Sequence, residues 1–368
     1  MYAVPADRPA PAAWGPALLR AVRAWPVRWR TLASALAGVV FVVGSGLLLT
    51  SGEASATVSG AVRALGGVHW AVVPALAGLM VAHFWCSAVA LRGAAGRRLP
   101  LLHATMAQFT AATANRVTGG GLGTVAVNAR YLSSRGTPAA PAAAAAGVLQ
   151  IGGAVADLLL FVVIIPVALA TGGGVLLSQL GTYFSGLAGP LTIVAAAAAV
   201  VAGAAVWLLR DRLRDPIAAC AQIMRRPGDL LLMMAASAAT TLIMGIAFAV
   251  SMLAIPAAAT PGQIGTLIAV YMIAAAAGGV VPGPGGLGST EAALVALLSV
   301  TGIETASALS GVLIFRAVTH WAPVPIGLLS AGTLRTGASA AGRPGGPRRQ
   351  RAAGTTLTID GGISSGAL

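Results

Sequence analysis

The chain has 368 residues, of which 57% are hydrophobic and only 9% are charged, whereas an average soluble domain carries about 25% charged residues. This composition excludes an ordinary soluble enzyme, a disordered protein and a DNA-binding domain. The formal net charge of +14 comes from arginine alone. These arginines fall in short clusters between long uncharged runs, so no nucleic-acid partner is expected. The two cysteines fit neither a disulfide framework nor a metal site, and no cofactor is implied.

Long uncharged runs predict membrane-spanning helices, because about 20 apolar residues are needed to cross a bilayer. The runs 31–52, 64–91, 158–209 and 230–290 contain no charged residue, and the last two are long enough to hold more than one span each. We therefore predict an all-α polytopic membrane protein. Its six clear spans are expected near 31–50, 68–91, 140–170, 187–209, 229–255 and 304–333.

The arginine clusters orient these spans, because short cytoplasmic loops carry the excess of positive charge. Clusters precede the first span, follow the second and the fourth, and fill the tail. Both termini are therefore expected on the cytoplasmic side of the membrane. Residues 1–30 are expected to form a cytoplasmic segment at the membrane surface, and 335–368 a disordered cytoplasmic tail.

Two Gly-interrupted segments, 99–135 and 263–302, remain between the clear spans, and each must return to its own side. The return arm of the first segment, 124–135, reaches only about 18 Å at 1.5 Å per residue, too short for about 30 Å of hydrocarbon. A re-entrant hairpin is therefore expected there. The second segment is compatible with a hairpin or with two full crossings.

An internal duplication is suggested by the sequence Gly-Gly-Leu-Gly, which occurs at 120–123 and again at 285–288. The flanking spans follow in the same order, and three clear spans per half make the second half enter the membrane inverted. This predicts an inverted-topology repeat of 31–172 and 173–334. Matching Gly-interrupted segments in inverted halves point to a transporter site, although Gly-rich and Ala-rich chains also produce such matches by chance.

A helix broken inside the membrane exposes backbone N–H groups at the start of the next half-helix, and these groups attract anions. Glycine lets a phosphate approach the amides closely. The expected partners are the bilayer and an anionic lipid or a polyprenyl phosphate. The residues expected to contact its headgroup at the two breaks are Gly120, Gly121, Gly123, Pro284, Gly285, Gly286 and Gly288.

Ionisable residues inside apolar spans are further candidates, because charge is costly there. Glu291 opens the half-helix after Gly288, where it either caps the helix or serves the site. Arg316 should lie about 18 Å into the last span, where it either pairs with Glu291 or binds phosphate. Arg130, after the first break, either holds a phosphate or marks the cytoplasmic interface.

The remaining polar candidates lie near the same features. His320, one turn after Arg316, either relays protons or makes a buried hydrogen bond. Asp157, in the third span, either relays protons or pairs with an arginine. Asn115 and Arg116 precede the first break and are expected to line the same cavity. The sequence contains no convincing catalytic constellation, so an enzyme is not expected.

The second break resembles the signature of the lysylphosphatidylglycerol synthase transmembrane-region family, which are flippase-like integral membrane proteins. The residues that carry this resemblance are Pro282, Pro284, Gly285, Gly286, Gly288, Glu291 and Arg316. The first break resembles the family's other motif, a Gly-rich break followed by Arg130 and by Asp157 in the next span. It departs from that motif at Thr124, where an acidic residue is usual, and at Gln150-Ile151, where Glu-Arg is usual.

The resemblance covers about 31–334 and implies the translocation half of a lipid-modifying system, since no soluble aminoacyl-transferase domain is expected in this sequence. The leading hypothesis is a flippase for an anionic lipid or a polyprenyl-linked precursor. One alternative is a membrane-embedded transferase acting on a lipid phosphate. The other is a non-catalytic partner subunit of a separate lipid synthase or glycosyltransferase.

Overall fold

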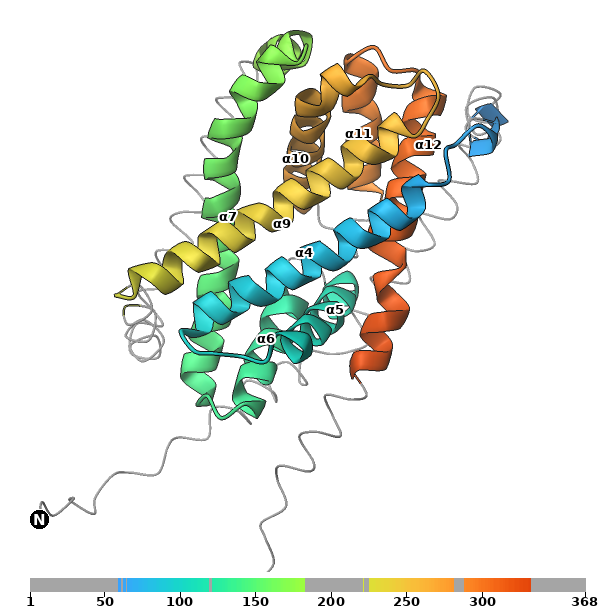
Figure 1. Ribbon diagram of the computed structural model, residues 1–368. Helices are drawn as coiled ribbons and strands as arrows, with labels where there is room; N and C mark the ends of the chain where they lie inside the picture. Colours follow the sequence, from blue (N-terminus) through green and yellow to red (C-terminus); the bar gives the residue numbers. More distant parts are fainter. Residues whose placement is uncertain are drawn as a thin grey trace, which may run out of the picture.

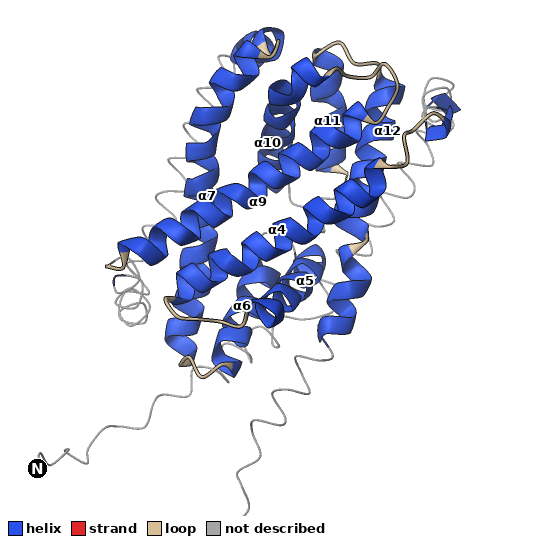
Figure 2. Cartoon of the chain, viewed as in Figure 1, coloured by secondary structure: helices blue, strands red, loops and turns tan. Residues whose placement is uncertain are grey.

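The computed structural model of the chain describes residues 59–60, 62–63, 65–118, 121–182, 221, 225–280 and 288–331. Within these residues all regular structure is helical, as Figure 2 shows. The spans predicted near 31–50 and 187–209 lie outside the described residues. The surface segment 1–30 and the tail 335–368 lie outside them as well.

Four predicted spans are helices that are long and apolar enough to cross a membrane. They are α4 (Val72–Ala95), α7 (Ala139–Ala170), α9 (Pro227–Leu253) and the helical stretch Thr305–Ala331, which begins with α12 (Thr305–Arg316). A fifth helix of this kind, Pro261–Gly278, joins the 3-10 turn η1 (Pro261–Gln263) to α10 (Ile264–Val280) and forms the first arm of the second interrupted segment.

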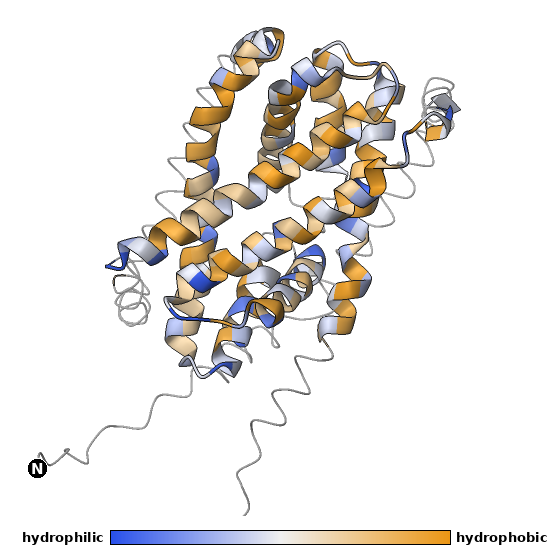
Figure 3. Cartoon of the chain, in the orientation of Figure 1, coloured by the Kyte–Doolittle hydropathy of each residue, from blue (hydrophilic) through white to orange (hydrophobic). Residues whose placement is uncertain are grey.

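The outward surface of α7 is strongly apolar. Only 17% of its most apolar stretch is buried in the protein, and Figure 3 shows hydrophobic residues along most of its length. The large exposed apolar side chains of this helix are Ile151, Val155, Leu158, Leu159, Val162, Val163, Ile165, Val167 and Leu169. A surface of this kind is stable against lipid chains rather than water, as a spanning helix requires.

Long-range hydrogen bonds identify one end of the molecule, which we call the Arg226 end. Arg226 Nη1 donates to the carbonyl oxygen of Gly96 at 2.8 Å, and Arg97 Nη1 donates to Thr137 Oγ1 at 3.2 Å. Arginines of the second and third clusters therefore share this end. The short α4–α5 and α6–α7 connections lie here too.

The opposite end, which we call the Thr171 end, is also fixed by hydrogen bonds. The backbone N–H of Thr266 donates to Thr171 Oγ1 at 3.0 Å, which joins the end of α7 to the start of α10. The backbone N–H of His69 donates to the carbonyl oxygen of Ala254 at 3.4 Å, which joins the residues before α4 to those after α9. Helices α4 and α9 therefore run antiparallel along each other between the two ends (Figure 1).

The first interrupted segment is a pair of packed helices, α5 (Leu101–Thr118) and α6 (Leu122–Ser134). The pair starts and finishes at the Arg226 end, because α5 follows α4 and α6 precedes α7. Neither helix is among the candidate spans. At 1.5 Å per residue the 13 residues of α6 extend about 20 Å, which is less than the hydrocarbon thickness of about 30 Å.

The second interrupted segment comprises α10 and α11 (Ser289–Val300), which also pack against each other. Helix α10 starts at the Thr171 end, and Figure 1 shows the loop between α11 and α12 at the same end. The 12 residues of α11 extend only about 18 Å. The two interrupted segments thus start from opposite ends of the molecule.

The largest apolar core lies among α9, α10, α11 and α12, with contributions from α4 and α7. Within it, the ring of Phe315 meets those of Phe248 and Tyr271 edge to face, with centroids 5.5 and 5.6 Å apart. Such aromatic contacts stabilise beyond the area they bury. They fix the position of the residue that directly precedes Arg316.

Glycine allows the arms of each interrupted segment to approach closely. A Cβ atom at Gly123 of α6 would lie 2.5 Å from backbone atoms of Ala114 and Asn115 in α5. In the second segment, a Cβ at Gly278 of α10 would overlap the side chain of Thr290 in α11. Close backbone approach through small residues is a common way for helices to associate in lipid.

We predict that Gly123→Ala destabilises the protein by about 1–3 kcal/mol, because the added methyl group meets rigid backbone rather than a mobile side chain. The measurement is the thermal unfolding temperature of the purified protein in detergent. The matched control is Gly147→Ala in α7, where a Cβ meets nothing within 4 Å and alanine favours the helix. Equal unfolding temperatures for the two variants would contradict the prediction.

Candidate functional site

The ion pair expected between Arg316 and Glu291 is present. Arg316 Nε lies 3.0 Å from Glu291 Oε1, and the two side chains are 15% and 23% exposed. Glu291 Oε2 also accepts a hydrogen bond of 2.7 Å from the backbone N–H of Gly288. Gly288 has φ 86° and caps α11 in a conformation that favours glycine. Glu291 therefore caps α11 and compensates the charge of Arg316 at once.

A π-helical turn, η3 (Ala317–Trp321), follows Arg316 and interrupts the span that the sequence predicts as one helix over 304–333. In this turn the backbone N–H of Ala322 donates to the carbonyl oxygen of Ala317 at 3.1 Å. Pro323 explains the interruption, because a proline ring clashes with the carbonyl group four residues earlier in an α-helix. Single π turns of this kind are frequent at functional sites.

His320 lies within this turn and contacts Arg316. Arg316 Nη1 is 3.2 Å from His320 Nδ1, and since a guanidinium group can only donate, Nδ1 must be the acceptor. The imidazole is then neutral and carries its proton on Nε2. His320 Nε2 is buried and has no hydrogen-bond partner among the described residues, so it is a free donor beside Arg316.

Arg116 brings the first break to the same place. It lies near the end of α5, two residues before the last residue of that helix, and is within electrostatic range of both Arg316 and His320. Helix α5 is held against the helical residues 323–331, where Thr110 Oγ1 and Ser330 Oγ are 3.1 Å apart. We call Arg116, Glu291, Arg316 and His320 the arginine cluster.

Hydrogen-bond donors without partners are concentrated here. In the described part of the chain, seven buried side-chain N and O atoms lack a partner. Four of them are donor nitrogens, two on Arg116 and one each on Arg316 and His320, and a fifth is the acceptor Oδ1 of Asn115. The N–H of Arg316 Nε is free because it is not directed at the Glu291 carboxylate despite the 3.0 Å separation. Each unmade hydrogen bond at a buried polar group costs about 1–3 kcal/mol, so this concentration indicates a ligand that accepts hydrogen bonds.

The charge of the arginine cluster supports the same interpretation. The two guanidinium groups remain protonated at any physiological pH, and Glu291 compensates only one of them. With His320 neutral, one positive charge remains uncompensated by the described residues. The cluster is therefore suited to an anion, and the fork of N–H groups on a guanidinium matches phosphate oxygens.

The other candidates at the breaks occupy different positions. Gly121 caps α6 with φ 77°, and Gly123 is buried between α5 and α6. Arg130 is exposed on α6, near the Arg226 end, and makes no hydrogen bond or ion pair with the residues that the structure describes. This position favours the interface interpretation of Arg130. The candidates outside the described residues are Gly120, Pro284, Gly285 and Gly286.

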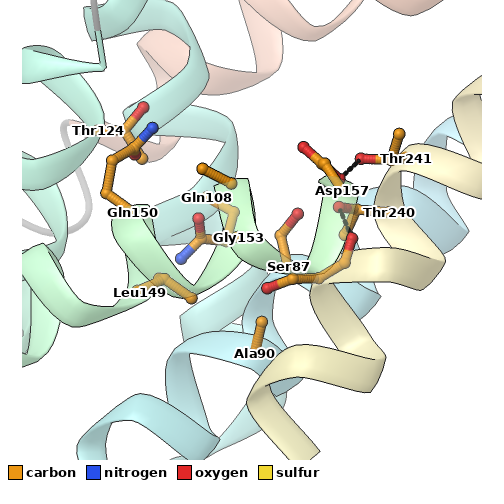
Figure 4. A pocket seen from close by; sticks show the side chains of 12 residues that line it. Ser87, Ala90, Gln108, Thr124, Leu149, Gln150, Gly153, Asp157, Thr240 and Thr241 are labelled. Carbon is orange, nitrogen blue, oxygen red and sulfur yellow. Dashed lines mark hydrogen bonds between the residues drawn. The ribbon is translucent and has the colours of Figure 1, made fainter. Parts of the chain in front are cut away.

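Asp157 lies apart from the direct contacts of the arginine cluster. Its Oδ1 accepts a hydrogen bond of 2.5 Å from Thr241 Oγ1 of α9, and no arginine pairs with it within the described ranges. Asp157 and Thr241 line a cavity of about 240 Å³ (Figure 4), together with Ser87, Ala90, Gln108, Thr124, Leu149, Gln150, Gly153, Ala154, Ser237 and Thr240.

The hydroxyl groups that line one side of this cavity were not predicted from the sequence. Ser237, Thr240 and Thr241 are spaced i, i+3 and i+4 along α9 and so share one face of the helix. That spacing was available as a signal in an otherwise apolar span. No group of three His, Cys, Asp or Glu residues that could hold a metal ion occurs in the part of the chain that the structure describes.

We predict that Glu291→Gln destabilises the protein by about 1–2 kcal/mol, because it removes the charge that compensates Arg316 but keeps an acceptor for the Gly288 N–H. Glu291→Ala should lose about 1 kcal/mol more, because it also removes the cap. The double change Glu291→Gln and Arg316→Gln should regain part of the loss. Thermal unfolding in detergent measures the stability of all three variants. If Glu291→Gln unfolds at the wild-type temperature, the stabilising role of Glu291 is limited to capping α11.

Comparison with known protein families matches residues 11–327 to the family described as "Lysylphosphatidylglycerol synthase TM region". No curated protein matches the chain. The family match spans both breaks, the arginine cluster and the helices named above except the last residues of Thr305–Ala331, and it confirms the resemblance found in the sequence motifs. The chain therefore belongs to the lysylphosphatidylglycerol synthase transmembrane-region family of membrane proteins.

Proposed function

We propose that the protein moves an anionic lipid between the leaflets of the bacterial cytoplasmic membrane and holds the lipid phosphate at the arginine cluster. The observation that carries this proposal is the set of buried, unpartnered donors on Arg116, Arg316 and His320. A phosphate accepts several hydrogen bonds through its oxygens and carries the negative charge that the cluster leaves uncompensated. A phospholipid and a polyprenyl phosphate share this chemistry.

The architecture proposed for this function is an inverted-topology repeat with two re-entrant hairpins. Helices α5 and α6 are together the first hairpin, and α10 and α11 are the second. Three observations support it: the hairpins start from opposite ends, α6 and α11 are shorter than the membrane is thick, and α4 and α9 run in opposite directions. In transporters built this way, the substrate site lies near the midplane, where broken helices meet.

The depth of the site in the membrane explains why irregular backbone would occur only at the site. Helix breaks inside the hydrocarbon are tolerated only where they are buried in protein or line a cavity. The arginine cluster includes residues that flank both breaks, since Arg116 precedes the first break and lies within electrostatic range of Arg316, and Glu291 follows the second. A headgroup bound there would satisfy backbone donors at the breaks as well as the side-chain donors.

We propose transport without chemical change of the lipid, with both termini in the cytoplasm. The cluster offers donors and one carboxylate, and that carboxylate is already engaged by Arg316 and by the Gly288 N–H. An engaged carboxylate is a poor candidate for a general base. The mass of lipid recovered after transport tests this point, since a transferase would alter it.

We predict that Arg116→Gln slows the exchange of anionic lipid between leaflets by about 10- to 100-fold. The reason is that a hydrogen bond to a charged group contributes about 1.5–3 kcal/mol, and about 1.4 kcal/mol corresponds to a factor of ten. The measurement uses vesicles containing the purified protein and a fluorescent phosphatidylglycerol or a labelled polyprenyl phosphate. Quenching of the outer leaflet then reports the rate of exchange.

The matched control is Arg130→Gln, which removes an exposed arginine of the same hairpin and should leave the exchange rate within about twofold of wild type. Fluorescent phosphatidylcholine serves as the neutral lipid. Thermal unfolding must confirm that both variants are folded. The proposal fails if wild-type protein accelerates the exchange of neither anionic lipid, or if Arg116→Gln and Arg130→Gln exchange lipid equally.

A further inference from the structure

Asp157 lies deep within a predicted membrane span. Helix α7 runs from Ala139 to Ala170, which at 1.5 Å per residue places Asp157 about 27 Å from its first residue and about 20 Å from its last. A charged side chain at such a depth is costly and is retained only with a partner. Asp157 therefore needs a compensating positive charge or a bound proton.

The described residues supply no such charge. Thr241 donates one hydrogen bond to Asp157 Oδ1, whereas an ionised carboxylate has about four acceptor positions. The only ion pair of a carboxylate inside the bundle of described helices is that of Glu291 with Arg316. A single hydroxyl group leaves the charge of Asp157 uncompensated among the described residues, so a bound cation is the simplest group to compensate it.

The cavity beside Asp157 has the chemistry of a cation site. Figure 4 shows Asp157, Thr240 and Thr241 gathered at one end of the cavity, with Ser87 beside them, and Thr124 and Gln150 at the other end. Side-chain oxygen atoms dominate the polar lining, and oxygen is the ligand that hard cations prefer. One carboxylate among neutral oxygens matches a single positive charge.

The cavity also lies between the two halves of the chain. Asp157 belongs to α7 and Ser87 to α4, whereas Thr240 and Thr241 belong to α9. Gln150 connects it to the first break, because a Cβ at Gly121 would lie 3.0 Å from the Gln150 side-chain nitrogen. Coupling ions in transporters with inverted repeats bind at such interfaces near the midplane.

We propose that the Asp157 cavity binds one monovalent cation, a proton or a sodium ion, and that this cation is the coupling ion of lipid transport. The coupling to lipid transport rests on the proposed function, whereas the binding of the cation does not. Asp157 supplies the charge, and the hydroxyl group of Thr241 is its fixed ligand or hydrogen-bond partner. The bound cation neutralises Asp157.

Tyr271 offers a route from this cavity to the arginine cluster. Its hydroxyl group lies within electrostatic range of both Asp157 and Arg316. On α4, His83 Nδ1 is 3.1 Å from the carbonyl oxygen of Thr240, the residue next to Thr241. Among the described residues of the helices packed against α7, Tyr271 and His83 are the titratable groups linked to the surroundings of Asp157.

The binding test compares wild type with Asp157→Asn, which keeps the shape of the side chain and removes its charge. The unfolding temperature of each protein in detergent is measured with NaCl replaced by choline chloride at constant pH, and then across pH 5–8 at constant NaCl. Because a ligand that binds only the folded state raises the unfolding temperature, wild type should be stabilised by sodium, or by lower pH if the cation is a proton. Asp157→Asn should lose that response.

Two further variants sharpen the binding test. Glu304→Gln removes an exposed carboxylate outside the cavity, whose partner is Ser307, and should keep the wild-type response. Thr241→Val should raise the half-saturating cation concentration by up to about tenfold, the effect of losing one hydrogen bond. The proposal is overturned if wild type and Asp157→Asn respond equally to both sodium and pH.

The coupling test uses protein in vesicles that carry a gradient of the cation identified by binding. Wild-type exchange of anionic lipid should depend on the direction of the gradient, and exchange by Asp157→Asn should not. If the rate of lipid exchange does not depend on the gradient, the proposed coupling is overturned and the proposed lipid transport is not. Absence of lipid exchange under every gradient, with cation binding present, overturns the proposed lipid transport instead.

Discussion

The need to compensate charge inside a membrane governs the arrangement of the arginine cluster. Glu291 meets this need for Arg316, and its second carboxylate oxygen holds the first turn of α11 through the N–H of Gly288. The start of α11 and the end of α12 are thereby joined at the point where the second break ends. Arg116 then adds a charge that no described carboxylate compensates. This excess of donors and positive charge is the physical basis of the proposed phosphate site.

The spans were predictable because length and hydropathy are properties of consecutive residues. The spans expected near 68–91, 140–170, 229–255 and 304–333 all occur as apolar helices of sufficient length. The short return arm of the first interrupted segment was predictable for the same reason, since a helix extends a fixed distance per residue. For the second segment, a hairpin and two full crossings had both been left open. The π turn η3 was not predicted, because the spacing of apolar residues along a helix does not show where one residue is inserted. Pro323, which follows the turn, was the available signal.

The site was predictable only in part, because it is assembled from residues far apart in the chain. Glu291 and Arg316 were expected as a pair since both are charges in apolar segments. The approach of Arg116 to them depends on how α5 packs against the residues after η3, and no local pattern carries that information. Thr240 and Thr241, by contrast, could have been found from the sequence, because their positions on one face of α9 form a local pattern. Asp157 was identified with two alternatives open, a proton relay or a pair with an arginine, and its hydrogen-bond partner among the described residues is Thr241.

The π turn at Ala317–Trp321 sets the rotational phase of everything after it. One additional residue in a helical turn rotates the following segment by about 100° relative to an uninterrupted α-helix. Gly327 and Ser330 therefore face α5 only because of this turn, and there they meet Phe109, Thr113 and Thr110. Helix α5 carries Arg116, so the phase of one turn beside Arg316 helps to bring the two arginines within electrostatic range of each other. The same turn that holds His320 thus also sets the spacing between the two halves of the anion site.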